Sequence, residues 1–452
     1  MKAIVIGAGP NGLTAAATLK KAGVEVTLVD QRGVPGGRFG GEIPLLHDTS
    51  LVSPAVLKDL GVDLAFQDAP TPHLPDGTAQ STPEAWGSFL ATWRPLIRSI
   101  AEAPAPDIGD EAPLWPLAKK AIALRKPGTA RMMDLLRLAP QNLEDLLGEF
   151  FEDPRQRALR IFPALLGSWM GPISPTAGAN LILTECLRGQ EPVGGTAGLV
   201  KALLAAAPSV TKARVTGIRI EKGRVLGVDT DQGAIDADRV ISCVGPITTL
   251  KELVHPTALP DHLHKDLYDV RVRGCMAKLH LALSAPIFPR ELVRTCDAPL
   301  DLERAFDDVK HRRLPRRPPL EVRHLAGGKS ASVLIHCAAN DLDGGWTAEA
   351  RAGLEQAVLA ELRAHVPDLD ERVSATELIT PDQLQADWGL DGGHPFQAEL
   401  AVDQLFVMRP LPKVARGETG ITGLGLGSDG QHPGVGPTLV PGWLAAKAAL
   451  SA

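Results

Sequence analysis

The first thirty residues alternate between short hydrophobic runs and a helical pattern. Residues 3–6 form a largely β-branched run, which is typical of a buried parallel strand. Residues 13–22 have the pattern of a helix, in which Ala15 and Ala16 are small enough to pack closely against a sheet. A second strand is predicted over residues 24–29. A strand, a helix and a strand in this order predict the first unit of a doubly wound α/β fold.

Farther along the chain, the pattern predicts helices first and then strands. Short strands separated by glycine turns follow one another from residue 215, and the last of them, residues 240–243, is predicted to return to the central sheet. Two further strands are predicted over residues 276–283 and 331–337. The helices predicted in these parts cover residues 143–151, 155–166, 179–188, 199–207 and 348–365.

Glycines join the first strand, the helix and the second strand in a pattern that indicates dinucleotide binding. Gly7, Gly9 and Gly12 have G-x-G-x-x-G spacing, which allows a tight turn and the close approach of a pyrophosphate to a helix N-terminus. Asp30 ends the second strand, where a carboxylate can accept hydrogen bonds from ribose hydroxyls. The alternative for the glycines alone is a turn without a ligand, but the flanking strands, helix and acid favour the nucleotide.

A second glycine pair follows the acid. Gly36, Gly37 and Arg38 resemble the FAD fingerprint of the flavoproteins with two dinucleotide-binding domains. The glycines allow backbone amides to face the pyrophosphate, and Arg38 would add charge-assisted donors. The alternative for Arg38 is an ordinary surface arginine. This pattern predicts FAD as the cofactor.

The order of the elements predicts two interleaved domains. A Rossmann-like FAD-binding domain of the α/β class would use residues 1–75, 190–255 and 396–452. An α+β substrate-binding domain would use residues 76–189 and 256–395.

Composition and charge narrow the class of protein. The chain has 452 residues, 44% of them hydrophobic and 22% charged, which is typical of a globular protein. Eighteen of the 45 glycines lie in residues 7–41 and 417–442, so both ends of the chain are candidates for a site. The net charge of −6 argues against a nucleic-acid partner. A basic run over residues 310–317 favours a solvated face, and the weaker alternative is contact with an anionic membrane or a partner surface.

Cysteine spacing and hydropathy exclude further classes. Five cysteines without C-x-x-C spacing argue against a disulfide framework and a metal site, and they favour a reducing, cytoplasmic location. The sequence has no run of 18 or more apolar residues, so no membrane-spanning helix is expected.

Motifs along the whole chain resemble one family. They include E-F-F-E-D-P (149–154), A-D-R-V-I-S (237–242), A-K-L-H-L-A-L (277–283), D-Q-L-F-V-M-R-P (403–410) and H-P-G-V-G (432–436). The chain resembles the phytoene-desaturase-like branch of the FAD-dependent amine oxidoreductases, within it the branch called pyridine nucleotide-disulfide oxidoreductase domain-containing protein 2. In that family the C-terminal block returns beside the flavin, and a helix beginning near Pro441 would stabilise negative charge on the reduced flavin.

The resemblance implies a set of cofactor-binding residues. Val215 would lie near the adenine, Asp429 would accept a hydrogen bond from a ribityl hydroxyl, and the backbone of 434–438 would face the isoalloxazine. Val435 and Leu439 stand where the family prefers glycine, and Asp30 stands where it usually has glutamate. The full predicted set is Gly7, Gly9, Pro10, Asn11, Gly12, Asp30, Gln31, Gly37, Arg38, Val215, Asp429, Gly434, Gly436, Pro437 and Thr438.

Three side chains are candidates for catalysis, each with a structural alternative. His432 would shuttle a proton beside the flavin or hold its loop. Lys278 would lie near the flavin, as a strand lysine does in amine oxidases, or be an ordinary strand charge. His394 would line the substrate cavity or be structural, and His47 is a further candidate for the substrate channel.

These observations favour an FAD-dependent enzyme that removes hydride from a C–C or C–N bond of a small or lipophilic molecule. Dioxygen or a quinone would accept the electrons. Two alternatives stay open, namely a redox-neutral isomerase that works on reduced flavin and a non-catalytic FAD-stabilised interaction protein. Neither the substrate nor the oligomeric state is predicted.

Overall fold

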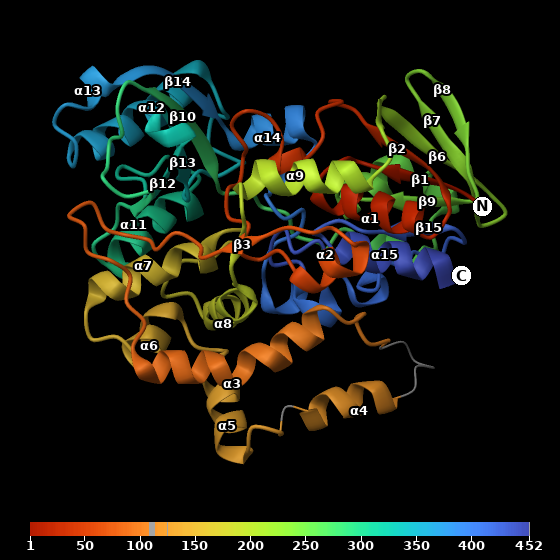
Figure 1. Cartoon of the computed structure of the whole chain (residues 1–452), viewed down its shortest axis with the longest axis horizontal. Helices are drawn as coiled ribbons and strands as arrows, with labels where there is room; N and C mark the ends of the chain where they lie inside the picture. Colours follow the sequence, from red (N-terminus) through yellow and green to blue (C-terminus); the bar gives the residue numbers. More distant parts are fainter. Residues whose placement is uncertain (108–113, 124, 452) are drawn as a thin grey trace.

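Two sheets lie side by side in the computed structural model, with a layer of helices beneath them (Figure 1). The structure describes residues 1–107, 114–123 and 125–451. The first sheet is parallel, with strand order β15-β9-β1-β2-β5. Its strands are β1 (Lys2–Ile6), β2 (Glu25–Asp30), β5 (Val210–Lys212), β9 (Arg239–Ser242) and β15 (Leu424–Leu426).

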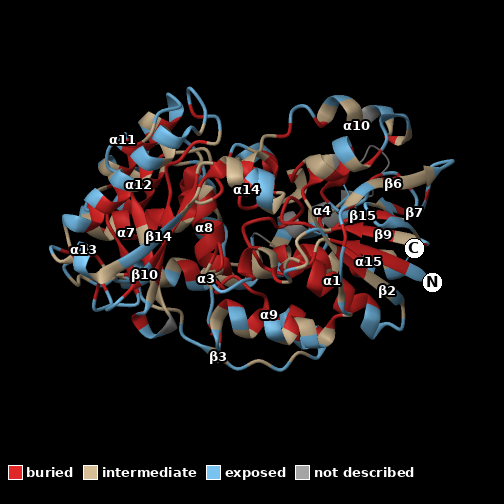
Figure 2. Ribbon diagram, turned by 90° about the horizontal axis from the view of Figure 1, so that it is seen from above, coloured by how far each residue is buried: buried red, intermediate tan, exposed pale blue. Residues whose placement is uncertain are grey.

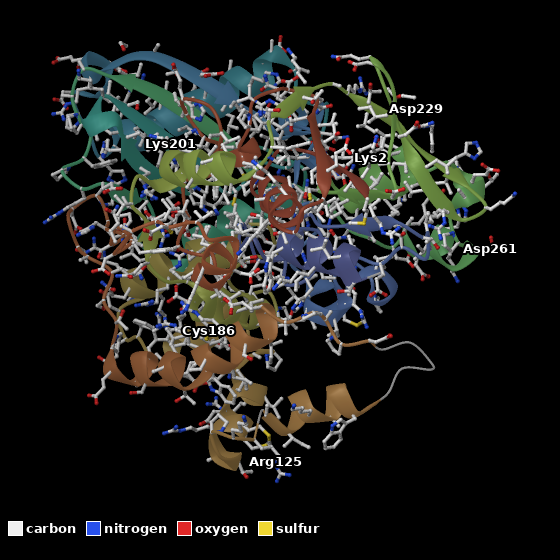
Figure 3. All side chains as sticks on the ribbon, turned by 45° about the vertical axis from the view of Figure 1, so that its right-hand side comes forward. Lys2, Arg125, Cys186, Lys201, Asp229 and Asp261 are labelled. Atoms are coloured by element: carbon white, nitrogen blue, oxygen red, sulfur yellow. The ribbon has the colours of Figure 1, made fainter. Side chains whose placement is uncertain are left out.

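Alternate residues of β1 face two different cores. Ala3 and Val5 pack with the helices α1 (Pro10–Lys21), α9 (Gly195–Ala206) and α15 (Val440–Ser451). Ile4 and Ile6 pack on the opposite face with Ile218, which belongs to a three-stranded antiparallel sheet. That sheet consists of β6 (Val215–Glu221), β7 (Arg224–Thr230) and β8 (Gly233–Asp236), and Asp229 marks its position at the edge of the molecule in Figure 3. Because both faces are covered, the strand is a continuous hydrophobic run, as expected for a parallel sheet.

The second sheet is antiparallel, with strand order β11-β12-β13-β10-β14. On β10 (Ala277–Leu283), the residues Ala277, Leu279 and Leu281 pack against α12 (Ala348–Arg363). Lys278 and His280 alternate with them and therefore point to the other face of the sheet. The remaining strands are β11 (Leu292–Arg294), β12 (Leu320–Leu325), β13 (Ser330–Ile335) and β14 (Val373–Ile379).

Helices of the middle of the chain form the layer below, where Cys186 marks α8 (Ala177–Leu187) in Figure 3. Trp86 and Trp93 of α3 (Glu84–Ala101) are fully buried there, and Figure 2 shows buried residues within the sheets and along the inner sides of the helices. A short antiparallel strand pair consists of β3 (Phe66–Gln67) and β4 (Glu191–Pro192). The other α-helices are α2 (Pro54–Leu60), α4 (Leu114–Ala123), α5 (Thr129–Leu138), α6 (Leu143–Gly148), α7 (Pro154–Leu165), α10 (Asp261–Asp266), α11 (Pro299–Lys310), α13 (Leu369–Arg372) and α14 (Pro381–Trp388).

The predicted elements are confirmed within one to four residues at their ends, and the predicted return strand is β9, which pairs with β1. The strand β5 was not predicted, since its three residues carry too short a pattern. All five strands of the parallel sheet lie in ranges that the sequence assigned to the FAD-binding domain. No helix in the described part of the chain is long and apolar enough to cross a membrane.

The basic run over residues 310–317 is largely paired with carboxylates. Lys310 lies 2.7 Å from Asp307, and Arg312 lies 3.1 Å from Asp341. Arg317 lies 2.7 Å from Glu361. These pairs reduce the charge that the run presents outward, which favours the solvated face over a docking surface.

The packing of the first and last helices leads to a test. A Cβ on Gly442 in α15 would lie 2.1 Å from the backbone oxygen of Asn11 in α1, so Gly442→Ala forces the helices apart. We expect a loss of about 1–3 kcal/mol in the free energy of unfolding, measured by urea denaturation. The control is Gly353→Ala in α12, where the nearest atom is 3.5 Å away. This substitution in a helix is expected to raise the free energy of unfolding by about 0.5–1 kcal/mol. Equal effects of the two substitutions would contradict this packing.

Candidate functional site

A cavity of about 440 Å³ opens at the carboxyl ends of β1 and β2, beside the N-terminus of α1. Gly7, Gly9 and Gly12 form part of its wall. A Cβ on Gly12 would lie 1.7 Å from the oxygen of Gly7, so the turn requires glycine at this position. The predicted residues that line the cavity are Gly7, Gly9, Pro10, Asn11, Gly12, Asp30, Gln31, Gly37, Arg38 and Val215.

Asp30 organises the loops at the mouth of this cavity. One carboxylate oxygen accepts a hydrogen bond from the backbone N–H of Ala8 at 2.8 Å. The other accepts from the N–H groups of Arg32 and Gly33 at 2.9 and 3.1 Å. Asp30 therefore joins the glycine turn to the loop after β2 and also lies in the cavity wall.

Arg38 and Asp429 form a buried ion pair that connects the two ends of the chain. Asn11 donates a hydrogen bond to the other oxygen of Asp429 at 2.7 Å. The loop that carries Arg38 packs directly against the glycine turn, and this contact requires Gly37, because a Cβ there would lie 2.8 Å from Gly9. Burial lowers the pKa of Arg38 to about 10, and its Nη1 has no hydrogen-bond partner among the described residues. A buried cationic donor in the cavity wall, next to a glycine turn and a helix N-terminus, fits the pyrophosphate of FAD.

Residues near 388 complete the cavity and were not predicted. The guanidinium of Arg32 stacks over the ring of Trp388 at 3.7 Å. Leu390 and Gln397 also line the wall. The motif D-W-G-L-D-G-G stands out in the sequence, but its spacing carries no chemical signal that assigns it to this cavity.

Arg409 holds the C-terminal loops together from within. It is fully buried, and all five of its N–H donors bind backbone oxygens, those of Phe396, Ala398, Glu399, Gln404 and Asp429, at 2.8–3.2 Å. Burial lowers its pKa to about 9. A Cβ on Gly434 would collide with this guanidinium at 1.6 Å. Gly434 of the H-P-G-V-G block is therefore required by the buried Arg409, and the motif alone does not reveal this reason.

A second, smaller cavity of about 50 Å³ lies between the polar face of the antiparallel sheet and the C-terminal block. Lys278 of β10 lines one side of it, and Val435 and Pro437 of the C-terminal block line another. Its other walls come from the segment after the glycine pair, from α7 and α8, and from the polar face of the antiparallel sheet. The remaining lining residues are Leu46, His47, Asp48, Leu51, Pro163, Leu166, Thr184, Arg188, Arg294, Glu321, Arg323, Ser332, Leu334, His336 and Phe396.

The three predicted catalytic residues lie in different surroundings. Lys278 lines the second cavity. His394 accepts the N–H of Phe396 at Nδ1 and lies 3.0 Å from the oxygen of Gly167 at Nε2, so both ring nitrogens bind backbone. Burial lowers its pKa to about 3, so the ring is neutral. His432 lies 3.1 Å from the oxygen of Ile100 and lines neither cavity.

Five predicted cofactor residues lie outside the wall of the larger cavity, namely Asp429, Gly434, Gly436, Pro437 and Thr438. Pro437 lines the second cavity instead. The two positions where the family prefers glycine also differ from each other. Val435 lines the second cavity, whereas Leu439 is fully buried with a left-handed backbone at φ 70°. The preference for glycine at 439 thus has a backbone reason, since this region is unfavourable for residues with a Cβ.

Sequence and structure comparisons place this arrangement in a family. The pattern of the FAD-dependent oxidoreductase family matches residues 2–409, and the chain belongs to that family. It is 26% identical, over an alignment 528 positions long, to pyridine nucleotide-disulfide oxidoreductase domain-containing protein 2 of Rattus norvegicus, covering 96% of this chain and 90% of that protein. It is also 26% identical, over an alignment 483 positions long, to the lycopene-forming phytoene desaturase of a Paracoccus species, covering 97% of this chain and 94% of that protein.

Solved structures share the fold. An oxidoreductase from Methanosarcina mazei superposes with a TM-score of 0.61 at 18% identity, over the whole of both chains. The cyclohexylamine oxidase of Brevibacterium oxydans superposes with a TM-score of 0.56 at 15% identity, covering 100% of this chain and 98% of that one. The Rossmann-like α/β fold and the FAD cofactor expected from the sequence are therefore confirmed.

The contacts of Arg409 predict a large effect of a conservative substitution. Arg409→Lys keeps the charge but loses the planar fork, which leaves several buried carbonyls without a donor. We expect the free energy of unfolding to fall by about 3–5 kcal/mol and the purified protein to lose its FAD. The control is Arg416→Lys, which changes a partly exposed arginine 3.0 Å from Glu418. This control should change stability by less than about 0.5 kcal/mol. If Arg409→Lys retains both flavin and stability, the predicted role of Arg409 is wrong.

Proposed function

We propose that this protein is an FAD-dependent dehydrogenase or desaturase that removes hydride from a C–C or C–N bond of an organic substrate. The observation that carries the proposal is the second cavity. It lies between the C-terminal block, which the family resemblance assigns to the isoalloxazine, and the polar face of the antiparallel sheet. A ligand in this cavity would contact Val435 and Pro437 on one side and Lys278 on the other.

FAD, when bound, supplies the acceptor for two electrons and one proton that leave a substrate carbon as hydride. A second proton leaves the neighbouring carbon or nitrogen, and a C=C or C=N bond forms. Dioxygen or a quinone is the proposed final electron acceptor. The similarity to a phytoene desaturase supports carbon–carbon desaturation, although the substrate of that relative is not transferred to this chain.

The chain's own part is to bind, orient and exclude water. Leu46, Leu51 and Phe396 supply apolar contact in the second cavity. Within that cavity burial lowers the pKa of Lys278 to about 7. His394 contacts no ligand in the proposal, since its two nitrogens bind backbone.

Purification tests the proposal directly. We expect a yellow protein with flavin absorbance, and a variant Gly12→Ala that is colourless, because its Cβ would disrupt the nucleotide turn. Screening of metabolites under anaerobic conditions should then identify compounds that bleach the flavin. A colourless wild-type protein that ignores added FAD would sink the proposal.

Two other results of the same screen would point to the alternatives. Turnover of a substrate without consumption of any acceptor would indicate an isomerase. A bound flavin that neither light nor dithionite reduces would indicate a non-catalytic protein.

A further inference from the structure

The polar face of the antiparallel sheet carries two rows of side chains toward the second cavity. In the first row, Lys278 pairs with Leu334, Leu334 with Glu321, and Glu321 with Arg294. In the second row, Ser332 lies between His280 and Arg323. Because residues of one strand alternate between faces, all of these charged and polar side chains point away from the apolar core that covers α12.

The arginines of this cavity are matched by carboxylates. Arg294 lies 2.7 Å from Glu321, and Arg188 lies 2.7 Å from Asp48. Arg323 lies 2.8 Å from Glu191, with which it makes two hydrogen bonds. Each of these guanidinium groups therefore has a carboxylate partner of its own.

Lys278 is the exception. Its side chain is 2% exposed and has no hydrogen bond or ion pair of its own in the described part of the chain, and Glu321, the carboxylate that favours its protonated form, is held by Arg294. An unpaired buried ammonium group is costly, and burial accordingly lowers the pKa of Lys278 to about 7. The lining of the cavity holds four basic side chains and the two carboxylates Asp48 and Glu321, so it carries a net positive charge whenever Lys278 is protonated.

Three neutral polar groups beside Lys278 also lack partners. The Oγ of Ser332 and the Nε2 atoms of His47 and His336 are buried and make no hydrogen bond among the described residues. Burial lowers the pKa of His336 to about 4 and that of His47 well below its usual value, so both rings are neutral. A hydroxyl and two neutral imidazoles can each donate one hydrogen bond.

Size and charge specify the group that these residues fit. A cavity of about 50 Å³ has room for a group of a few heavy atoms. A carboxylate brings a negative charge to Lys278, and its two oxygens can accept the hydrogen bonds of Ser332 and the imidazoles. A hydrocarbon would leave Lys278, Ser332 and both histidines without partners, and a neutral amine offers a single acceptor for these four donor groups.

Arg188 also lines a basic surface cleft of about 600 Å³, together with Arg94 and Arg98. The cleft has a single carboxylate in its lining, Asp68. Arginines in such a cleft attract anions from solution and raise their concentration at the protein surface.

We propose that the substrate carries a carboxylate, which Lys278 binds as an ion pair with hydrogen bonds from Ser332 and the imidazoles, so that its carbon chain extends toward Val435 and Pro437. This inference rests on the proposed function, since it names the chemical class of the substrate for the same site. Lys278 is then a substrate-binding residue.

Calorimetry on the flavin-loaded protein tests the proposal with propionate and its uncharged counterpart propionamide. We expect wild type to bind propionate at least 100-fold more tightly than propionamide. Lys278→Met should lose that preference, and Lys278→Arg should keep part of it. The matched control is Lys201→Met on the exposed side of α9, labelled in Figure 3, which should behave as wild type.

Three results would overturn the inference. They are no binding of propionate by wild type, equal binding of acid and amide, and unchanged binding in Lys278→Met. If the Lys278→Met variant loses its flavin, the comparison of propionate with propionamide binding by wild type still tests the inference. The proposed function fails separately, through a flavin that no screened compound reduces. A neutral compound that reduces the flavin equally in wild type and Lys278→Met would be a fourth such result, and it would leave the proposed function standing.

Discussion

The guanidinium of Arg409 is the contact on which the C-terminal half of the site depends. It has five N–H donors in one plane, and five backbone carbonyls from residues 396–429 surround them. These carbonyls belong to loops that make few hydrogen bonds in regular secondary structure. A buried cation without a carboxylate partner is stable here because the carbonyl dipoles all point toward it.

This arrangement explains why backbone dominates the cofactor side of the molecule. Arg409 binds the carbonyls of the 396–404 loops together with the backbone oxygen of Asp429, and the carboxylate of Asp429 binds Arg38 and Asn11. Asp429 thus connects the C-terminal loops to the first helix. The two glycine-rich ends of the sequence meet at this point, where Gly434 and Gly442 leave no room for a side chain.

The nucleotide half of the site could be predicted because its determinants are local. A glycine turn, a helix start and an acid at the end of the next strand lie within residues 7–30, so their spacing alone specifies how they meet in space. The second cavity could not be predicted in the same way. Its ion pairs join Asp48 to Arg188 and Glu191 to Arg323, and no periodicity in the sequence connects such distant residues. The structural role of His394 could not be predicted for a similar reason, since its partner is the carbonyl of Gly167, 227 residues away.

The contrast between the two halves suggests how one fold accommodates different substrates. The cofactor side consists of glycines and carbonyls, where almost any added atom disturbs the backbone. The other side consists of alternate residues on β10, β12 and β13, whose opposite neighbours form the core with α12. Lys278 and Ser332 can therefore change in charge or size while Leu279 and Val333 keep the sheet in place. In the proposed function the substrate contacts this face of the sheet, whose side chains can change without altering either the sheet core or the nucleotide turn.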